Sequence, residues 1–256
     1  MAETGKTPLF SIVTVTLDNV GGLRNTYESL EKQSFRDFEW IVKDGYSQDG
    51  TLKYLETCRV DILITEPDKG IYDAMNKALD HVNGRYVIFL NAADALSKSN
   101  VLERIAEKLS DGAEFLYGDS FEKISGDHLK LKRARKHQKV RQGMFTHHQA
   151  MIYKTGILQK LKFNTDYRIA ADYDLTLAYL KRCRNIVYLN FPVCIFEEGG
   201  VSQQRVGLGR AEQFHIRKQR KCCSILMNRL IFCLQFLNWQ LRRFFPSVYW
   251  FLKRRI

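Results

Sequence analysis

The 256-residue sequence has little proline and no long apolar run. Its four prolines and sixteen glycines form no low-complexity linker, and no unit repeats with a period of 20–50 residues. The longest uncharged, apolar-rich segment is the twelve-residue stretch 230–241, well short of the roughly 20 residues that a membrane-spanning helix needs. The start of the chain, MAETGKTPLF, lacks the basic and apolar pattern of a signal peptide. These absences favour a globular protein that does not cross a membrane.

Several common site motifs are absent as well. The six cysteines include no C-x-x-C pair, and no histidine stands at a spacing suited to zinc, so we expect reduced thiols in a cytosolic protein. There is also no G-x-G-x-x-G segment and no complete G-x-x-x-x-G-K-[ST] segment. These absences argue against dinucleotide-dependent oxidoreductases and P-loop enzymes.

The net charge of +12 is concentrated at one end of the chain. Residues 203–256 contain twelve Lys or Arg and a single acid, Glu212, whereas residues 1–202 contain 28 bases and 27 acids. A protein that binds nucleic acid through its body would carry its basic excess there. The distribution instead predicts a balanced domain over 1–202 and a basic tail over 203–256.

The balanced part alternates between the two periods of regular secondary structure. β-Branched and apolar runs predict strands at 10–17, 38–44, 61–65, 85–90 and 114–118, and helical spacing predicts helices at 23–33, 51–58, 71–82 and 99–109. Such alternation predicts an α/β fold with a mainly parallel sheet flanked by helices. In sheets of this kind, ligands bind beyond the carboxyl ends of the strands.

Acidic residues follow most of the predicted strands at that edge. Asp18, Asp44, Asp68, Asp94 and Asp119 each stand shortly after a strand. Any one of them could simply cap the next helix, and for a single residue both interpretations are open. A carboxylate after nearly every strand nevertheless favours a common binding site.

Eight segments at these positions resemble the family 2 inverting glycosyltransferases, whose fold is the nucleotide-diphosphosugar-binding GT-A fold. The sequence is most similar to the bacterial branch that builds capsule, exopolysaccharide and colanic-acid-type repeat units. The resemblance covers about residues 9–215. The segments, in family order, are SIVTVTLDN, IVKDGYSQDGT, EPDKGIYDAMNKAL, FLNAAD, YGD, HHQAMIY, AADYDL and GGVS.

The resemblance implies a set of residues that contact the nucleotide-diphosphosugar donor. Asp44 would accept hydrogen bonds from the base, and the helix opening at Gly70 would receive phosphate charge through its free N–H groups. Asn76 either reaches the ligand or braces a loop, while Asp49 more often shapes the turn in this family. The implied donor-binding residues are Thr16, Asp44, Glu66, Asp68, Lys69, Asn76 and Asn91.

The resemblance also implies the residues that perform the chemistry. Asp94 stands at the metal motif, where it would hold Mg²⁺ or Mn²⁺ with phosphate oxygens and water. Asp172 stands at the position of the catalytic base, and Asp174, two residues on, would cap or form a salt bridge. His148 and Gln149 would hydrogen-bond sugar or phosphate of the acceptor.

The tail has the composition of a membrane-surface anchor. Over 225–245, Asn228 and Gln235 share one helical face with Arg242, and the opposite face is apolar, with Met227, Leu230, Leu234, Leu237, Leu241 and Phe245. We expect residues 224–256 to bind an anionic membrane surface; a helix packed on the domain or in a dimer is the alternative.

Together these features predict an inverting sugar transfer from a nucleotide-diphosphosugar to a polyprenyl-diphosphate-linked acceptor at the inner face of the cytoplasmic membrane. Nucleic acid is not expected as a partner. Two alternatives remain: a nucleotidyltransferase of similar fold, which would normally show a glycine-rich basic signature after the first strand, and a basic nucleic-acid-binding protein.

Overall fold

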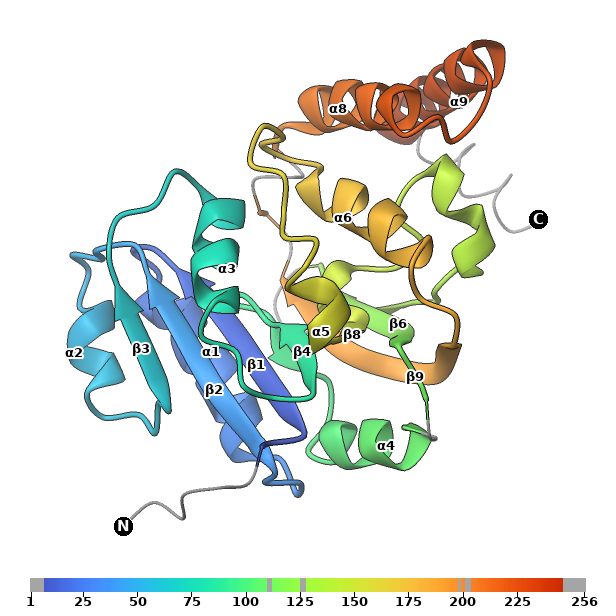
Figure 1. Cartoon of the computed structure of the whole chain (residues 1–256). Helices are drawn as coiled ribbons and strands as arrows, with labels where there is room; N and C mark the ends of the chain where they lie inside the picture. Colours follow the sequence, from blue (N-terminus) through green and yellow to red (C-terminus); the bar gives the residue numbers. More distant parts are fainter. Residues whose placement is uncertain (1–6, 110–111, 125–127, 198, 201–203, 246–256) are drawn as a thin grey trace.

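One half of the sheet is parallel, and it carries the predicted nucleotide-binding edge. The computed structural model describes residues 7–109, 112–124, 128–197, 199–200 and 204–245. Strands β3 (Ile62–Thr65), β2 (Phe38–Asp44), β1 (Phe10–Thr16) and β4 (Tyr86–Phe89) lie in that order and run parallel (Figure 1). Their β-branched, apolar runs suit a sheet that is covered on both faces.

Helices connect these strands, as the alternating pattern predicts. They are α1 (Val20–Glu31), α2 (Thr51–Leu55) and α3 (Ile71–Leu79). Helix α1 begins at Asn19, whose side chain accepts a hydrogen bond from the N–H of Gly22 at 3.0 Å. The predicted helix at 99–109 is α4 (Val101–Lys108).

The second half of the sheet is mixed, with antiparallel pairs beside the parallel pair of β6 (Phe115–Lys123) and β9 (Ile186–Glu197). Strand β8 (Met151–Lys154) lies antiparallel between β4 and β6. Strand β9 also pairs with the short β5 (Ala95–Leu96), while β7 (Leu129–Lys132) forms a hairpin with β6. Apart from this hairpin, the pairing partners here are far apart in sequence, and local patterns do not reveal them.

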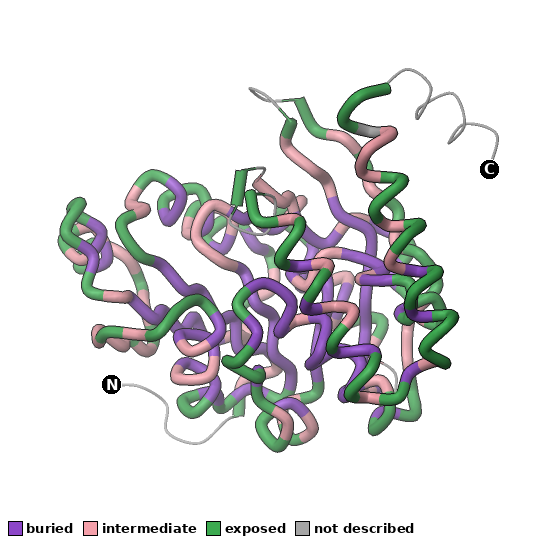
Figure 2. The backbone as a smooth tube through the Cα atoms, turned by 90° about the horizontal axis from the view of Figure 1, so that it is seen from above, coloured by how far each residue is buried: buried purple, intermediate pink, exposed green. Residues whose placement is uncertain are grey.

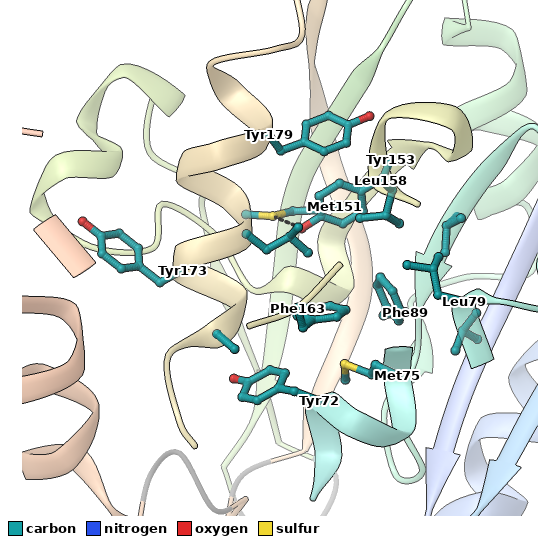
Figure 3. Packing of buried hydrophobic residues seen from close by; sticks show 14 of the residues in the cluster. Tyr72, Met75, Leu79, Phe89, Met151, Tyr153, Leu158, Phe163, Tyr173 and Tyr179 are labelled. Atoms are coloured by element: carbon teal, nitrogen blue, oxygen red, sulfur yellow. Dashed lines mark hydrogen bonds between the residues drawn. The ribbon is translucent and has the colours of Figure 1, made fainter. Parts of the chain in front are cut away.

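Each face of the sheet has its own apolar core. The buried residues gather in the interior of the molecule, and exposed residues predominate around its outside (Figure 2). One core packs β1 and β4 against α1 and α4. The other joins α3, β8 and helix α6 (Ala171–Leu180), with Phe89 and Phe163 in edge contact at 5.2 Å between ring centroids (Figure 3). The remaining short elements are η1 (His137–Gln142), η2 (His148–Ala150) and α5 (Thr155–Leu158).

Two helices of the basic tail lie side by side at the α6 end of the molecule (Figure 1). They are α8 (Val206–Gln219) and α9 (Ile225–Phe244). The predicted tail contacts the predicted domain, because Arg220, just after α8, donates to both carboxylate oxygens of Asp174 in α6. None of the helices within the described residues is long and apolar enough to span a membrane.

The tail helix α9 packs on the body with its polar face. Asn228 is 1% exposed, and its side chain bonds to Arg217 and to the carbonyl of Phe214 in α8. Gln235 donates to the carbonyl of Gln142 in η1 at 3.0 Å. The predicted apolar face is therefore turned outward, and much of it is exposed: Met227, Leu230, Leu234, Leu237 and Phe245. The side chain of Arg242 and residues 246–256 lie outside the described part of the tail.

Candidate active site

The carboxyl ends of the parallel strands meet at one edge, which brings the predicted donor-binding residues together. Thr16 is the register partner of Asp44, and Asp44 is the partner of Thr65 at the end of β3. Beyond β4, the N–H of Ala92 donates to the carbonyl of Val15 at 3.2 Å. Segments that are up to about 75 residues apart in the sequence thus form one rim of the sheet.

Asp44 is anchored by one carboxylate oxygen and leaves the other one free. Its Oδ2 accepts from the N–H groups of Tyr46 at 2.9 Å and Ser47 at 3.0 Å, whereas Oδ1 is buried without a hydrogen-bond partner. Tyr46, where the family usually has glycine, has a φ of 70°, in the left-handed region that glycine favours. The neighbouring Thr16 also has a buried hydroxyl without a partner.

A buried lysine that the sequence analysis did not identify organises the edge at β3. Lys43 is fully buried, and its ammonium group donates to the carbonyls of Asp44 at 2.9 Å and Glu66 at 2.6 Å and to Asp68 Oδ2 at 3.0 Å. Asp68 Oδ1 accepts from the N–H of Gly70. Asp68 therefore closes the turn before α3 with both of its oxygens.

The start of α3 offers fewer free N–H groups than the sequence analysis expects. The N–H of Lys69 donates to Asp73 Oδ2 at 2.9 Å, and the N–H of Gly70 is bonded to Asp68. Glu66 forms an ion pair with Lys77 at 2.9 Å and is about half exposed. The ammonium group of Lys69 remains as the charged donor that the helix N-terminus can present to a phosphate.

Asn76 and Asp49 have bracing roles. Both polar atoms of the Asn76 amide pair with the backbone of Phe163, at 2.9 Å and 2.8 Å, so the structure argues against the predicted donor contact of Asn76. Asp49 accepts from the N–H groups of Thr51 and Val20, which confirms its predicted role in the turn that starts α2.

The loop that carries the metal motif is held from α1. The buried hydroxyl of Thr26 donates to the carbonyl of Asp94 at 2.7 Å and accepts from the N–H of Ala93 at 3.2 Å. Ala93 has a φ of 88°, which is unfavourable for alanine. In the same loop, the side-chain oxygen Oδ1 of Asn91 is buried and has no partner.

Asp94 is buried, and its carboxylate is held by two donors. Gln149 Nε2 donates to Oδ2 at 2.7 Å, and the N–H of Glu197 donates to Oδ1 at 3.2 Å. Burial raises the pKa of Asp94 to about 7, although both hydrogen bonds lower it. Near neutral pH this carboxyl is therefore close to its titration midpoint.

His148 and Asp172 face each other across the apolar core. His148 Nδ1 lies 3.9 Å from Asp172 Oδ2, and the hydroxyl of Tyr72 lies 3.3 Å from Asp172 Oδ1. Burial raises the pKa of Asp172 to about 6 and lowers the pKa of His148 to about 4, which leaves the imidazole neutral. Nε2 of His148 is buried without a partner. Asp174 points away to Arg220, which confirms its predicted salt bridge.

Consecutive residues of η2 therefore reach both candidate carboxylates: Gln149 bonds to Asp94, and His148 approaches Asp172. The preceding residue, His147, instead pairs with Glu122 at 3.1 Å, and Glu122 also accepts a hydrogen bond from Lys132. These two partners together hold the pKa of Glu122 at about 2.

The unsatisfied polar atoms coincide with the predicted site. Among the residues that the structure describes, ten buried side-chain nitrogen or oxygen atoms have no hydrogen-bond partner. Half of them belong to predicted site residues: Thr16, Asp44, Asn91, His148 and Gln149. Leaving a buried polar atom unpaired costs about 1–3 kcal/mol, so such a concentration marks a surface that is built to be completed by a ligand.

The described residues contain no group of three or more His, Cys, Asp or Glu side chains that could hold a metal ion. The Asp94 carboxylate and the unpaired amide oxygen of Asn91 are nonetheless hard oxygen ligands on one loop, the type that Mg²⁺ and Mn²⁺ prefer. These residues fit a cation whose coordination is completed by diphosphate oxygens and water.

Four residues that hold this site were not identified from the sequence: Thr26, Lys43, Tyr72 and Glu212. Each acts through a contact with a segment at least 20 residues away. Among these, only the charge of Lys43 within a buried strand gave a detectable signal, because an unpaired lysine is rarely fully buried.

The sequence is similar to those of known glycosyltransferases. The model of the family "Glycosyl transferase family 2" matches residues 11–195. The PGL/p-HBAD biosynthesis glycosyltransferase of Mycobacterium bovis (strain BCG / Pasteur 1173P2) is 28% identical over 214 residues, which cover 76% of this chain and 79% of that protein.

Two solved structures share the fold at low sequence identity. S. aureus TarS 1-349 in complex with UDP-GlcNAc has a TM-score of 0.68 at 18% identity, covering 93% of this chain and 75% of that one. The mannosyltransferase PcManGT from Pyrobaculum calidifontis, in complex with GDP-Man and Mn²⁺, has a TM-score of 0.65 at 15% identity, covering 89% and 70%. The fold is thus the predicted GT-A fold, and the chain belongs to glycosyl transferase family 2.

Proposed function

We propose that this protein transfers a sugar, with inversion, from a nucleotide-diphosphosugar to a hydroxyl group of a polyprenyl-diphosphate-linked oligosaccharide in surface polysaccharide synthesis. The observation that carries the proposal is the group of buried, unpaired polar atoms at the carboxyl edge of the sheet. The donors bound in the two similar structures, UDP-GlcNAc and GDP-Man, belong to this chemical class.

The donor lies along the rim of the parallel strands in this proposal. The free Oδ1 of Asp44 accepts an N–H of the nucleobase, and the Thr16 hydroxyl lies beside it at the end of β1. Lys69 offers its positive charge to the diphosphate. Asn91 and Asp94 would hold a divalent cation, which would neutralise the charge of the leaving diphosphate.

The proton transfer is assigned to Asp172. Its carboxylate removes the proton from the acceptor hydroxyl, whose oxygen attacks the anomeric carbon from the face opposite the diphosphate while the bond between that carbon and the diphosphate oxygen breaks. A pKa of about 6 leaves Asp172 ionised at neutral pH and yet more basic than an exposed aspartate. The neutral His148, with Nε2 unpaired, can hydrogen-bond the acceptor.

Thermal unfolding tests the donor site without knowledge of the acceptor. The protein is melted with UDP, GDP or dTDP, each with and without Mn²⁺. A nucleotide at 100 times its dissociation constant stabilises the protein by about 2.7 kcal/mol. We expect one nucleotide to raise the melting temperature, and more so with Mn²⁺. An equal melting temperature in all conditions would contradict the proposal.

The exposed apolar face of α9 supports a role at the membrane surface. Its polar face is already occupied by α8 and η1, through Asn228 and Gln235, and the outward leucines are about half exposed or more. Arg229 and Arg243 are exposed on the same helix. Each basic residue near an anionic leaflet contributes about 1 kcal/mol, and the apolar side chains add their own burial. We propose that the enzyme binds the inner face of the cytoplasmic membrane in this way.

Vesicle cosedimentation tests this assignment. Replacing Leu226, Leu230 and Leu237 together by Gln removes exposed apolar surface and preserves the contacts of Asn228, so the helix should stay docked. We expect the wild type, but not this triple variant, to cosediment with vesicles of anionic phospholipid. A double variant with Leu63→Gln and Ile124→Gln, exposed apolar residues away from α9, serves as the control. Equal binding of the triple variant would overturn the role of α9.

A further inference from the structure

The loop that leads into α6 is held by a carboxylate of the tail. Glu212 of α8 accepts three backbone hydrogen bonds, from the N–H groups of Arg168 at 2.9 Å, Ile169 at 2.9 Å and Ala170 at 2.8 Å. Ala170 is the N-cap of α6 and provides no side-chain cap of its own. Glu212 thus supplies, from another helix, the negative charge and the acceptors that the start of a helix requires.

Helix α3 contacts the same loop from the opposite side. The Tyr72 hydroxyl lies 2.7 Å from the carbonyl oxygen of Ile169 and 3.3 Å from Asp172 Oδ1, and these two acceptors share its single proton. Figure 3 shows the Tyr72 ring at the edge of the apolar cluster, with the hydroxyl pointing away from Met75. Asp172 is only two residues beyond the part of the loop that Glu212 holds.

Close packing leaves this loop little freedom. A Cβ atom at Gly209 would lie 2.9 Å from Ile169 Cγ2, so α8 lies directly against the loop at a position where only glycine fits without a shift. Glu212 is one turn further along α8 and is 9% exposed. Both the position of the loop and the first turn of α6 therefore depend on α8.

We propose that Glu212 is a positioning residue for Asp172, and that α8 is part of the catalytic unit rather than of an appended tail. This inference rests on the proposed function, in which Asp172 is the base. The acid at position 212 is the single acid of the basic segment 203–256, and the structure places it against the loop that carries the reaction.

Glu212 also acts on Asp172 through its charge. The groups that face Asp172 are Tyr72 from α3, His148 from η2, Tyr153 from β8 and Glu212 from α8. Burial is the main cause that raises the pKa of Asp172, the Tyr72 hydrogen bond lowers it, and the negative charge of Glu212 raises it. Removing Glu212 and removing the Tyr72 hydroxyl should therefore shift the pKa of Asp172 in opposite directions.

The test measures the rate at which nucleoside diphosphate is released from a sugar donor between pH 5 and pH 8. The donor is UDP-GlcNAc if UDP raises the melting temperature and GDP-mannose if GDP does. Mn²⁺ is present, and water serves as the acceptor. For Glu212→Gln we expect release to slow at least tenfold, and the acidic limb of the rate profile to move to lower pH. The stabilisation by nucleotide should stay unchanged, because the donor contacts lie on other elements. The control is Lys218→Gln, an exposed residue of the same helix.

A merely structural role predicts a different result. If Glu212→Gln lowers the melting temperature but releases nucleotide at the rate and with the pH profile of Lys218→Gln, the inference is overturned. If Glu212→Gln fails to fold, the Tyr72→Phe variant tests the inference instead. Slower nucleotide release, with the acidic limb of the rate profile moved to higher pH, would support the view that the loop held between α3 and α8 positions Asp172. An unchanged rate profile would refute it. Full activity of Asp172→Asn would instead refute the base assignment, and so the two failures are distinguishable.

Discussion

Replacing Asp172 by Asn should stabilise the protein while it abolishes the proposed reaction. Burial raises the pKa of Asp172 from 3.8 to about 6, so the folded state holds this carboxyl's proton more tightly than the unfolded state does. As the pH rises from 3.8 to about 6, such a group lowers the free energy of unfolding, because its carboxyl ionises less readily in the folded protein than in the unfolded chain. At one pH unit per 1.36 kcal/mol, the full cost above pH 7 is about 3 kcal/mol.

The size of the effect depends on pH in a defined way. Linkage with these two pKa values gives a cost of about 1.6 kcal/mol at pH 5 and about 3 kcal/mol at pH 7.5. The amide of Asn carries no charge and avoids this cost. The advantage of Asp172→Asn over the wild type should therefore grow by about 1.4 kcal/mol between these pH values, which corresponds to roughly 3–6 °C in melting temperature.

The assay compares the melting temperatures of both proteins at pH 5 and pH 7.5, together with nucleoside diphosphate release at pH 7.5. Other titrating groups are common to both proteins and cancel in the difference. Release should fall by about 10²–10⁴-fold, the usual contribution of a general base. Asp174→Asn is the matched control on the same helix: it breaks the ion pair with Arg220 and should destabilise the protein. A difference between Asp172→Asn and wild type that is constant with pH would refute the reasoning.

Three further predictions concern the metal motif and the tail. Asp94→Asn should remove the Mn²⁺-dependent part of the nucleotide-induced rise in melting temperature and leave the part seen without metal; retention of both parts would exclude Asp94 as a ligand. Thr26→Val, which removes the hydroxyl that holds the Asp94 loop, should destabilise the protein by about 1–2 kcal/mol in urea unfolding and weaken the Mn²⁺ effect. Asn228→Leu should cost about 2–3 kcal/mol, because it leaves the fully buried Arg217 without an acceptor, whereas the exposed Arg229→Ala should cost little.

The parallel half of the fold was predictable from the sequence because its signals are local. Strands β1, β2 and β4 are almost entirely buried runs, and β1, β2 and β3 are each followed within a few residues by a polar turn and a helix. The expected strand at 38–44 coincides with β2. The rule that parallel strands end at one edge of the sheet then predicts that Thr16 and Asp44 lie close together.

The mixed half could not be derived in the same way. Strand β8 follows a loop without regular spacing and lies between β4 and β6, more than 25 residues away from either in sequence. Its place between them decides that His148 approaches Asp172 and that Gln149 meets Asp94. The sequence resemblance identified these four residues. Which of them lie next to each other depends on the order of strands that are far apart in sequence, and local periodicity does not reveal that order.

The tail shows how a correct pattern can leave the direction of packing open. The spacing of Asn228 and Gln235 predicted a polar face, and a polar face ordinarily points to water. The structure instead buries Asn228 against Arg217, whose buried guanidinium needs an acceptor, and turns the leucines outward. The two interpretations of the tail, packed helix and surface anchor, are therefore compatible, because they use opposite faces of the same helix.

The two candidate carboxylates have different relations to the rest of the molecule. Asp94 is held at the sheet edge by α1 of the parallel half and by η2 and β9 of the mixed half. Asp172 stands at the start of α6, and its loop is held by α3 on one side and by α8 on the other. Helix α8 in turn packs on α9, whose exposed apolar face we assign to the membrane. An acceptor carried by the membrane would thus meet the base through the same helices that dock the enzyme, while the donor enters over the sheet edge.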